Sequence, residues 1–352
     1  NFSGDFYWEP KYLKCEDFKG TLGKTSFNMN VNYHVDDKMK GDNFLSLQSD
    51  YINFDELFKF ELGPSNSNKP KANTTKDVAT HAKAFNIFNI PFPDLKMHVD
   101  VGRFTYHRYD LKKVNVLIRT TSEHFLYVDT FSMNAAGGLI AMNGYFNGSD
   151  SERIYLKPKL RVENVDLDQL LFKFENFGQD VILSENLHGQ LSADVRGEIR
   201  VYPDLIPDLD QSEIHLDASV LNGSLENFEP MMLLSGYFSE EALQQVEFDT
   251  LQNHIDITQG VISIPSMNIE SSLGHLEVAG TQDMQDNINY LVRIPWSLVK
   301  EAAKNKLFRR ENSKVDESEI VEVEPGKKTK YLNVNIVGTT DDFDIKLRKP
   351  KS

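Results

Sequence analysis

Apolar and polar residues alternate with a period of two along most of the chain. Residues 254–257 read HIDI, residues 267–270 read MNIE and residues 275–278 read HLEV. The same alternation returns near the end, over residues 332–336 and 343–348. Strands with one dry face and one wet face have this pattern, which is typical of antiparallel sheet. It predicts a mainly β fold.

Turn signals and a few helical segments interrupt the alternation. Short helices are predicted at residues 54–60 and 167–174, and a broken helix pair at residues 228–246. The strongest helical pattern covers residues 296–310, WSLVKEAAKNKLFRR, where an apolar stripe lies opposite a basic one. Turns between strands are indicated by the Gly-containing pairs at 137–138, 147–148, 222–223 and 259–260.

Two internal repeats link the halves of the chain. Residues 128–145 and 248–281 share Ser-Met-Asn, a small or Gly pair, then an apolar residue and a Gly, which aligns Met133 with Met267 across a short indel. Residues 53–60 recur as residues 165–174, about 113 positions later. A chain that repeats strand-rich units favours an extended surface over one catalytic pocket.

These patterns together predict an elongated, strongly bent antiparallel β-sheet groove built from repeated strand units, with a few short helices. We expect an N-terminal β-rich part over residues 1–100, with a mobile loop near 63–80 that is rich in Pro, Ser, Asn and Lys. A repeat region follows over 101–300, then a basic helix end and a charged loop over 301–330. Residues 331–352 are expected to form a closing hairpin.

Composition narrows the possible partners. The 352 residues carry a formal net charge of −15 and a sequence pI near 5.1, which argues against non-specific nucleic-acid binding. The single cysteine, Cys15, excludes an internal disulfide and is expected to be a small, half-buried apolar residue. The sequence contains no run of 18 or more apolar residues, so it predicts no membrane-spanning helix. The absence of an initiator Met or a signal peptide leads us to expect a processed or truncated chain.

Motifs for chemistry are weak. Residues 20–25, GTLGKT, place two residues between the glycines where a phosphate-binding loop needs four, so a β-turn is the better interpretation. The nine histidines lie singly, without the close local pairs of zinc sites. No Gly-x-Ser-x-Gly elbow occurs, and adjacent carboxylates are expected among 53 acidic residues. We therefore expect a non-enzymatic protein with no catalytic residues, no metal and no cofactor.

The region from Phe228 to Pro295 resembles the C-terminal region of the AsmA family, and the likeness covers most of residues 100–300. The motifs are strand ends and turns, and they carry no chemistry. They are residues 227–231 (NFEPM), 248–251 (FDTL), 262–267 (ISIPSM), 271–274 (SSLG), 278–280 (VAG) and 290–295 (YLVRIP), with 128–144 and 187–194 upstream.

The resemblance implies a periplasmic protein of the Gram-negative envelope, tethered to the inner membrane by an N-terminal segment that this chain lacks. It implies a bridge-like lipid-transfer protein whose apolar groove binds or conducts phospholipid, or another acyl-chain lipid, between the inner and outer membranes. The alternative hypothesis is an envelope interaction or scaffold module with a filled β-sandwich core that docks a protein partner. The third class, a glycan-active enzyme, would need two carboxylates at catalytic separation, which the sequence does not nominate.

Two sets of candidate residues follow from these hypotheses. The predicted groove lining is Ile255, Ile257, Ile262, Ile264, Ile269, Leu276, Val278, Leu332, Val334 and Ile336. The second set is a possible contact with an anionic membrane surface, although packing of the same helix over the end of the sheet is the favoured interpretation. It comprises Trp296, Lys300, Lys304, Lys306, Phe308, Arg309 and Arg310.

Overall fold

The computed structural model contains one open sheet of 17 strands with a few short helices, so the predicted mainly β class is confirmed. The chain folds as two compact units. The first comprises Asn1–Val165 and Asp194–Ile214, and the second comprises Asp166–Ala193 and His215–Ser352. The structure describes residues 2–35, 43–57, 86–106, 109–173, 185–227, 232, 235, 238–297, 330–339 and 342–348.

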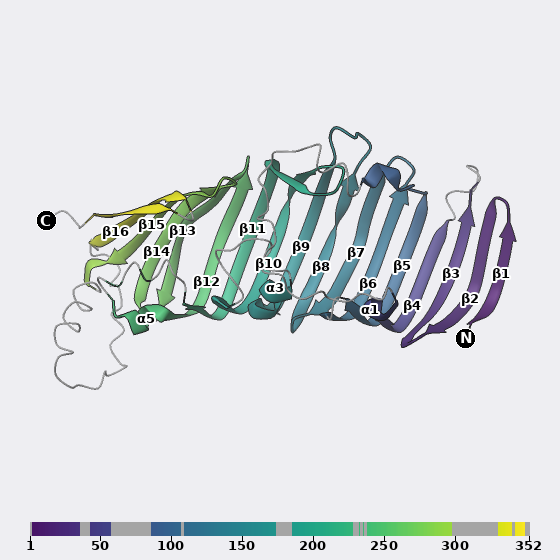
Figure 1. Ribbon diagram of the computed structural model, residues 1–352, viewed down its shortest axis with the longest axis horizontal. Coiled ribbons are helices and arrows are strands. Elements are labelled where there is room, and N and C mark those ends of the chain that lie inside the picture. The colour runs from purple at the N-terminus through teal and green to yellow at the C-terminus, as the bar shows by residue number, and fades with distance from the viewer. Residues whose placement is uncertain are drawn as a thin grey trace. The chain divides into compact units, whose positions relative to one another are not determined.

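The strands of each unit follow one another in chain order (Figure 1). The first unit holds β1 (Phe2–Glu9), β2 (Tyr12–Leu22), β3 (Thr25–His34), β4 (Phe44–Asn53), β5 (Leu95–Tyr106), β6 (Tyr109–Thr121), β7 (Phe125–Ala135), β8 (Gly138–Asn147) and β9 (Tyr155–Asp166). The second holds β12 (Gln245–Thr258), β13 (Val261–Ser271), β14 (Gly274–Asp283), β15 (Asn287–Pro295), β16 (Tyr331–Thr339) and β17 (Phe343–Arg348). Strands β10 (Leu187–Val201) and β11 (Pro207–Glu226) contribute residues to both.

The boundaries between the two compact units differ from the region boundaries predicted at residues 100 and 300. Residue 100 lies inside β5, and residue 300 lies outside the described residues. The boundaries between the two units instead fall within β10 and β11, because each of these long strands has residues in both units. The predicted closing hairpin is present as β16 and β17, which pair antiparallel.

Within β1 to β9 and within β12 to β17, the described strand pairs are antiparallel, as expected, except for one parallel pair. Neighbouring strands pair antiparallel from β1 to β4, from β5 to β9 and from β12 to β17. Strands β4 and β5 are parallel, with Leu47 opposite Val99. A parallel pair needs a long connection, and residues 54–94 lie between β4 and β5 in the chain. Period-two alternation cannot detect this reversal, because it reports faces and not directions.

The repeat of residues 53–60 at residues 165–174 corresponds to two short helices, and each helix starts at the end of a strand. Helix α1 (Phe54–Leu57) follows β4, and α3 (Leu167–Lys173) follows β9. The Asn53 side chain accepts a hydrogen bond from the Glu56 backbone N–H at 3.0 Å, and that of Asp166 accepts one from Gln169 at 2.9 Å. Asn and Asp are favoured N-caps because they satisfy such orphan donors. The two copies of this repeat are therefore the same capped junction between a strand and a helix.

The longer repeat corresponds to two bulged hairpins. In β7–β8, Val128 pairs with Gly144 and Phe131 with Met142, so two residues of β7 oppose one of β8. In β13–β14, Ile264 pairs with Gly280 and Met267 with Val278, which is the same bulge.

This alignment corrects one equivalence inferred from sequence. Gly144 and Gly280 are 136 positions apart, and at that offset the hairpins superpose without an indel. The counterpart of Met267 is therefore Phe131, and Met133 corresponds to Ile269. Two strands lie between α1 and the β7–β8 hairpin, whereas three lie between α3 and the β13–β14 hairpin. The two repeats therefore have different offsets.

Other helical predictions are only partly met. Within residues 228–246 the structure has helix α5 (Glu240–Gln244), capped by the Ser239 hydroxyl, and Val246 already belongs to β12. The predicted helix over 296–310 starts at Trp296, but its residues from 298 onward lie outside the described residues. The loop near 63–80 also lies outside them. Residues 20–25 form the β2–β3 turn, as predicted.

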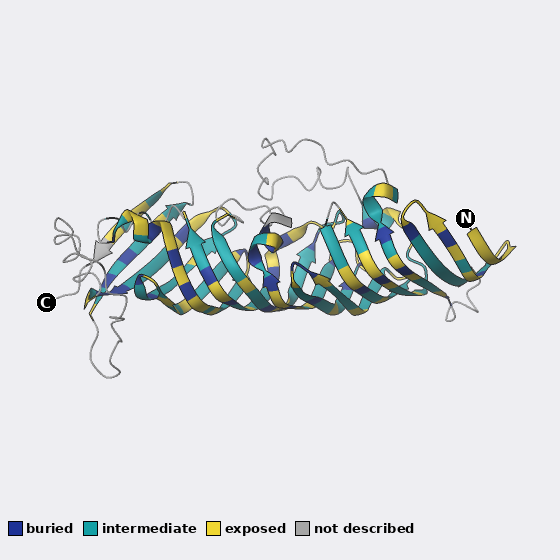
Figure 2. Cartoon of the chain, turned by 90° about the horizontal axis from the view of Figure 1, so that it is seen from below, coloured by how far each residue is buried: buried dark blue, intermediate teal, exposed yellow. Residues whose placement is uncertain are grey.

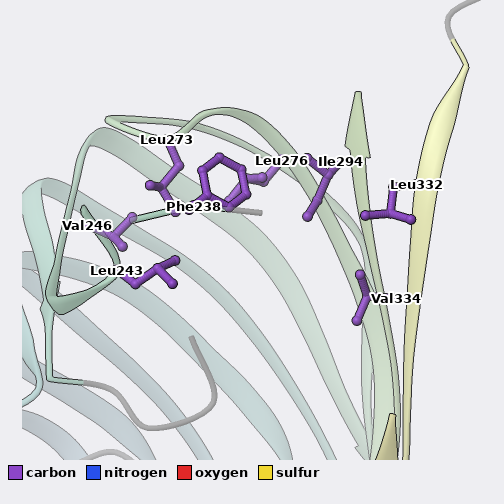
Figure 3. Close-up of a cluster of buried hydrophobic side chains, with 8 residues drawn as sticks. All are labelled: Phe238, Leu243, Val246, Leu273, Leu276, Ile294, Leu332 and Val334. Carbon is purple, nitrogen blue, oxygen red and sulfur yellow. The ribbon is translucent and has the colours of Figure 1, made fainter. Parts of the chain in front are cut away.

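Buried side chains gather where a helix lies against one face of the sheet. Leu57 of α1 packs against Ile52, Val101 and Val114, and residues of η2 (Ile87–Asn89) pack with Phe146. In the second unit, Leu167 and Leu171 of α3 pack against Phe248. The largest cluster surrounds Leu243 of α5, and Figure 3 shows its side chains pointing toward one another. Its members are Phe238, Leu243, Val246, Leu273, Leu276, Ile294, Leu332 and Val334.

Asn43, which is only 2% exposed, joins three strands at the start of β4. Its side-chain oxygen accepts a hydrogen bond from the His34 backbone N–H, and its amide donates to the carbonyls of His34 and Asp94.

Asn43→Ala is expected to lower the free energy of unfolding by about 3 kcal/mol, because it removes three hydrogen bonds that each contribute about 1 kcal/mol net. Urea denaturation measures this. Asn89→Ala, at an exposed position, is the control and should stay within about 0.5 kcal/mol of wild type; equal effects would contradict the role of Asn43.

Candidate functional site

An unbroken row of apolar side chains crosses eight strands of the first unit. Each member is the direct cross-strand partner of the next, and directly opposed residues share one face of a sheet. The N-terminal apolar row, as we call it, consists of Phe18, Met29, Leu47, Val99, Val116, Phe131, Met142 and Leu160.

The N-terminal apolar row is only partly covered. All eight of its residues are intermediate in exposure, and none is buried. Figure 2 shows the same on the strands, where intermediate stretches predominate and buried stretches are short. A filled core buries such side chains almost completely. Leu57 of α1 packs against the cluster at Val101 and Val114. Three residues of the row pack against the same cluster and keep only part of their exposure: Leu47, Val99 and Val116.

The ten residues predicted to line a groove lie on one face of β12, β13, β14 and β16. Ile257 pairs with Ile262, Ile264 with Gly280, and Ile269 with Leu276. Strand β15 continues the face, because Val292 pairs with both Val278 and Val334, Ile294 with Leu332, and Tyr290 with Ile336. Ile255 shares the face because it lies two residues before Ile257. The face that these residues form is called the C-terminal apolar face.

Three of the ten are core residues and not open lining. Leu276, Leu332 and Val334 are 4%, 0% and 1% exposed, because α5 and Phe238 cover them. The other seven remain partly exposed. Period-two alternation placed all ten on one face, but it could not show which of them a short helix covers.

The opposite face of the sheet is polar and carries paired charges. In the second unit, Arg293 and Glu277 form an ion pair. In the first unit, Arg119 donates two hydrogen bonds to Asp129, at 2.6 and 2.8 Å. The arginine beside it holds the pKa of Asp129 below its ordinary value. This face therefore carries ion pairs in both units.

Cys15 is buried, at 4% exposure, on the apolar side of β2 between Phe6 and Val31. Burial raises the pKa of its thiol, which keeps the group protonated and unreactive. The sequence predicted such a small buried residue, although it is more deeply buried than expected.

The structure corrects the prediction that the histidines are scattered. His215 and His254 lie together on β11 and β12, and their rings stack with centroids 6.1 Å apart. Asp217 and Asp256 lie beside them. The missed signal was the sequence His-x-Asp, which occurs on both strands and, at period two, places both side chains on one face.

The proposed membrane-contact residues are mostly beyond the described part of the chain. Only Trp296 is described, and it packs against the cluster around Leu243. Its backbone N–H donates to the carbonyl of Lys330 at 2.7 Å. Lys300, Lys304, Lys306, Phe308, Arg309 and Arg310 lie outside the described residues.

Comparisons with known proteins returned nothing: no family model, no curated protein and no solved structure matches this chain. Within the described residues, no helix has the length and apolar character needed to cross a membrane.

Proposed function

We propose that this protein is a non-enzymatic lipid-binding protein that holds acyl chains against the apolar face of its sheet. The observation that carries this proposal is the N-terminal apolar row, which is continuous over eight strands and still partly exposed. Contiguous and partly exposed apolar surface of this kind supports a binding site for an apolar partner.

The size of the row suits a long apolar ligand. At a strand spacing of roughly 4.8 Å, eight strands present a row of about 34 Å. Each methylene transferred from water onto such a surface contributes about 0.8 kcal/mol. Binding along the row would therefore need no single specific residue, which agrees with the absence of a catalytic motif from the sequence.

The filled-sandwich alternative is less well supported. A sandwich needs two sheets packed about 10 Å apart, with the inner faces buried against each other. The described strands belong to one sheet, and the N-terminal apolar row keeps partial exposure on all eight strands. The apolar face therefore lacks the second layer that a sandwich core requires, as far as the described residues show.

The cellular role follows from the resemblance to the AsmA family. We propose that the protein acts in the periplasm, tethered to the inner membrane by a segment outside this chain. There it would bind or conduct phospholipid between the inner and outer membranes. Partly exposed apolar side chains on β2 to β9 support a conduit for acyl chains, and they leave open which headgroup accompanies them.

The direct test is lipid mass spectrometry on the full 352-residue chain, expressed in a Gram-negative host and purified without detergent. We expect phospholipid to co-purify at a reproducible ratio to protein, and a fluorescent acyl-chain probe to displace it. A preparation that carries no lipid and binds no acyl probe would contradict the proposal.

A further inference from the structure

Two histidines and two aspartates form a compact cluster on the polar face of the second unit. His215-Leu-Asp217 lies on β11 and His254-Ile-Asp256 on β12. Each histidine is opposite the aspartate of the other strand: His215 Nδ1 is 2.6 Å from Asp256 Oδ1, and His254 Nδ1 is 2.6 Å from Asp217 Oδ1. Asp256 Oδ1 is also 3.0 Å from His254 Nε2.

We infer that His215, His254 and Asp256 bind a divalent transition metal ion such as Zn²⁺. One ligand atom from each of these three residues lies within 4.8 Å of the others. Ligand atoms around tetrahedral zinc are separated by roughly 3.3 Å, so small side-chain rotations bring the three into place. Imidazole and carboxylate together suit Zn²⁺, Cu²⁺ or Ni²⁺ better than Mg²⁺ or Ca²⁺, which favour oxygen ligands alone.

Asp217 supplies the support that metal-binding histidines need. It lies at the Nδ1 of His254, while Nε2 of the same ring points to Asp256 and the metal position. A histidine that binds a metal through one ring nitrogen usually donates the N–H of the other nitrogen to such a carboxylate. This hydrogen bond fixes the tautomer and the orientation of the ring. Asp217 is thus a positioning residue, and it touches the ring and not the metal.

The electrostatics of the cluster agree with binding of a cation. Both nitrogens of His254 face carboxylates, and the hydrogen bond with Asp217 is the main reason that its pKa is raised. The hydrogen bond with His215 lowers the pKa of Asp256.

The cluster is accessible and separate from the apolar face. The four side chains are between 33% and 50% exposed, so an ion can enter from solution and retain a position for water. The intervening Ile255 and the following Ile257 belong to the C-terminal apolar face on the other side of the sheet. Metal binding here does not depend on lipid binding.

Titration of the EDTA-treated full chain with Zn²⁺ against a chromophoric chelator tests this site. We expect one Zn²⁺ per chain, with affinity at least about 100-fold weaker in His215→Ala, His254→Ala and Asp256→Ala. Asp217→Asn should weaken binding by about 10- to 100-fold. His275→Ala is the matched control, because His275 pairs with Glu270, away from the cluster, and its loss should leave the affinity unchanged.

Two further measurements keep the result interpretable. Circular dichroism of each metal-free variant checks folding, and visible absorption of the Co²⁺ form reports the loss of a nitrogen ligand in His254→Ala. The inference is overturned if wild type shows no saturable binding of one ion per chain. It is also overturned if a folded His215→Ala/His254→Ala double variant binds as wild type does.

Discussion

Val116→Glu is expected to reduce co-purifying lipid at least about tenfold, while Leu117→Glu beside it leaves the lipid in place. Val116 lies at the centre of the N-terminal apolar row, paired with Val99 and Phe131. A carboxylate placed against an acyl chain loses its hydration without gaining a partner, which costs several kcal/mol. Since about 1.4 kcal/mol corresponds to a factor of ten, even partial relief by water should empty the site.

Leu117 is a matched control because the pleat turns it to the other face, where it pairs with Thr130 and is 37% exposed. Its replacement changes charge and volume in the same strand without touching the apolar row. Val116→Leu, which keeps the position apolar, should retain lipid. Lipid mass spectrometry measures all three, and circular dichroism checks that each variant is folded. Equal lipid content in the two glutamate variants would exclude the row as the binding surface.

Gly144→Ala should destabilise the first unit by about 3 kcal/mol, because the bulge leaves no room for a side chain. Gly144 has a φ of +147°, a conformation that residues with a Cβ rarely adopt. An added Cβ would also lie 2.3 Å from the Lys157 carbonyl oxygen on β9. That oxygen belongs to strand backbone, so it cannot move aside without disturbing the β8–β9 pairing.

Gly137→Ala separates the two causes. Gly137 also has a positive φ, +81°, but an added Cβ would meet nothing within 4 Å. Only the left-handed penalty applies there, so we expect a loss of about 1 kcal/mol. Hydrogen exchange of the β7–β9 amides, followed for both variants, reports local as well as global opening. A loss at Gly144 no greater than that at Gly137 would show that crowding by β9 is unimportant.

The repeat of residues 128–145 at residues 248–281 shows which features the sequence predicts and which it does not. The shared glycines Gly144 and Gly280 were recognised, and both lie beside a bulge. The shared Ser-Met-Asn was aligned two residues away from the structural match, because bulge and turn geometry, and not residue identity, set the register. The short helices that follow Asn53 and Asp166 are predicted from the sequence, since a helical pattern over a few residues is a local property.

The candidate sites divide in the same way. All ten predicted lining residues share a face, because alternation with period two is local and strong. The burial of Leu276, Leu332 and Val334 by α5 depends on packing between distant segments, which alternation does not report. The His–Asp cluster was missed for a related reason: its members are neighbours only across the β11–β12 pairing.

The sequence by itself determined that this chain forms strands with one apolar and one polar face, separated by turns and short helices. These features depend on side-chain spacing and on hydrogen bonds within a few residues. The tertiary structure decided the parallel β4–β5 pair, which apolar side chains stay partly exposed, and the proximity of His215 to His254. Each of these depends on which strands lie side by side, and packing between residues far apart in the chain sets that arrangement.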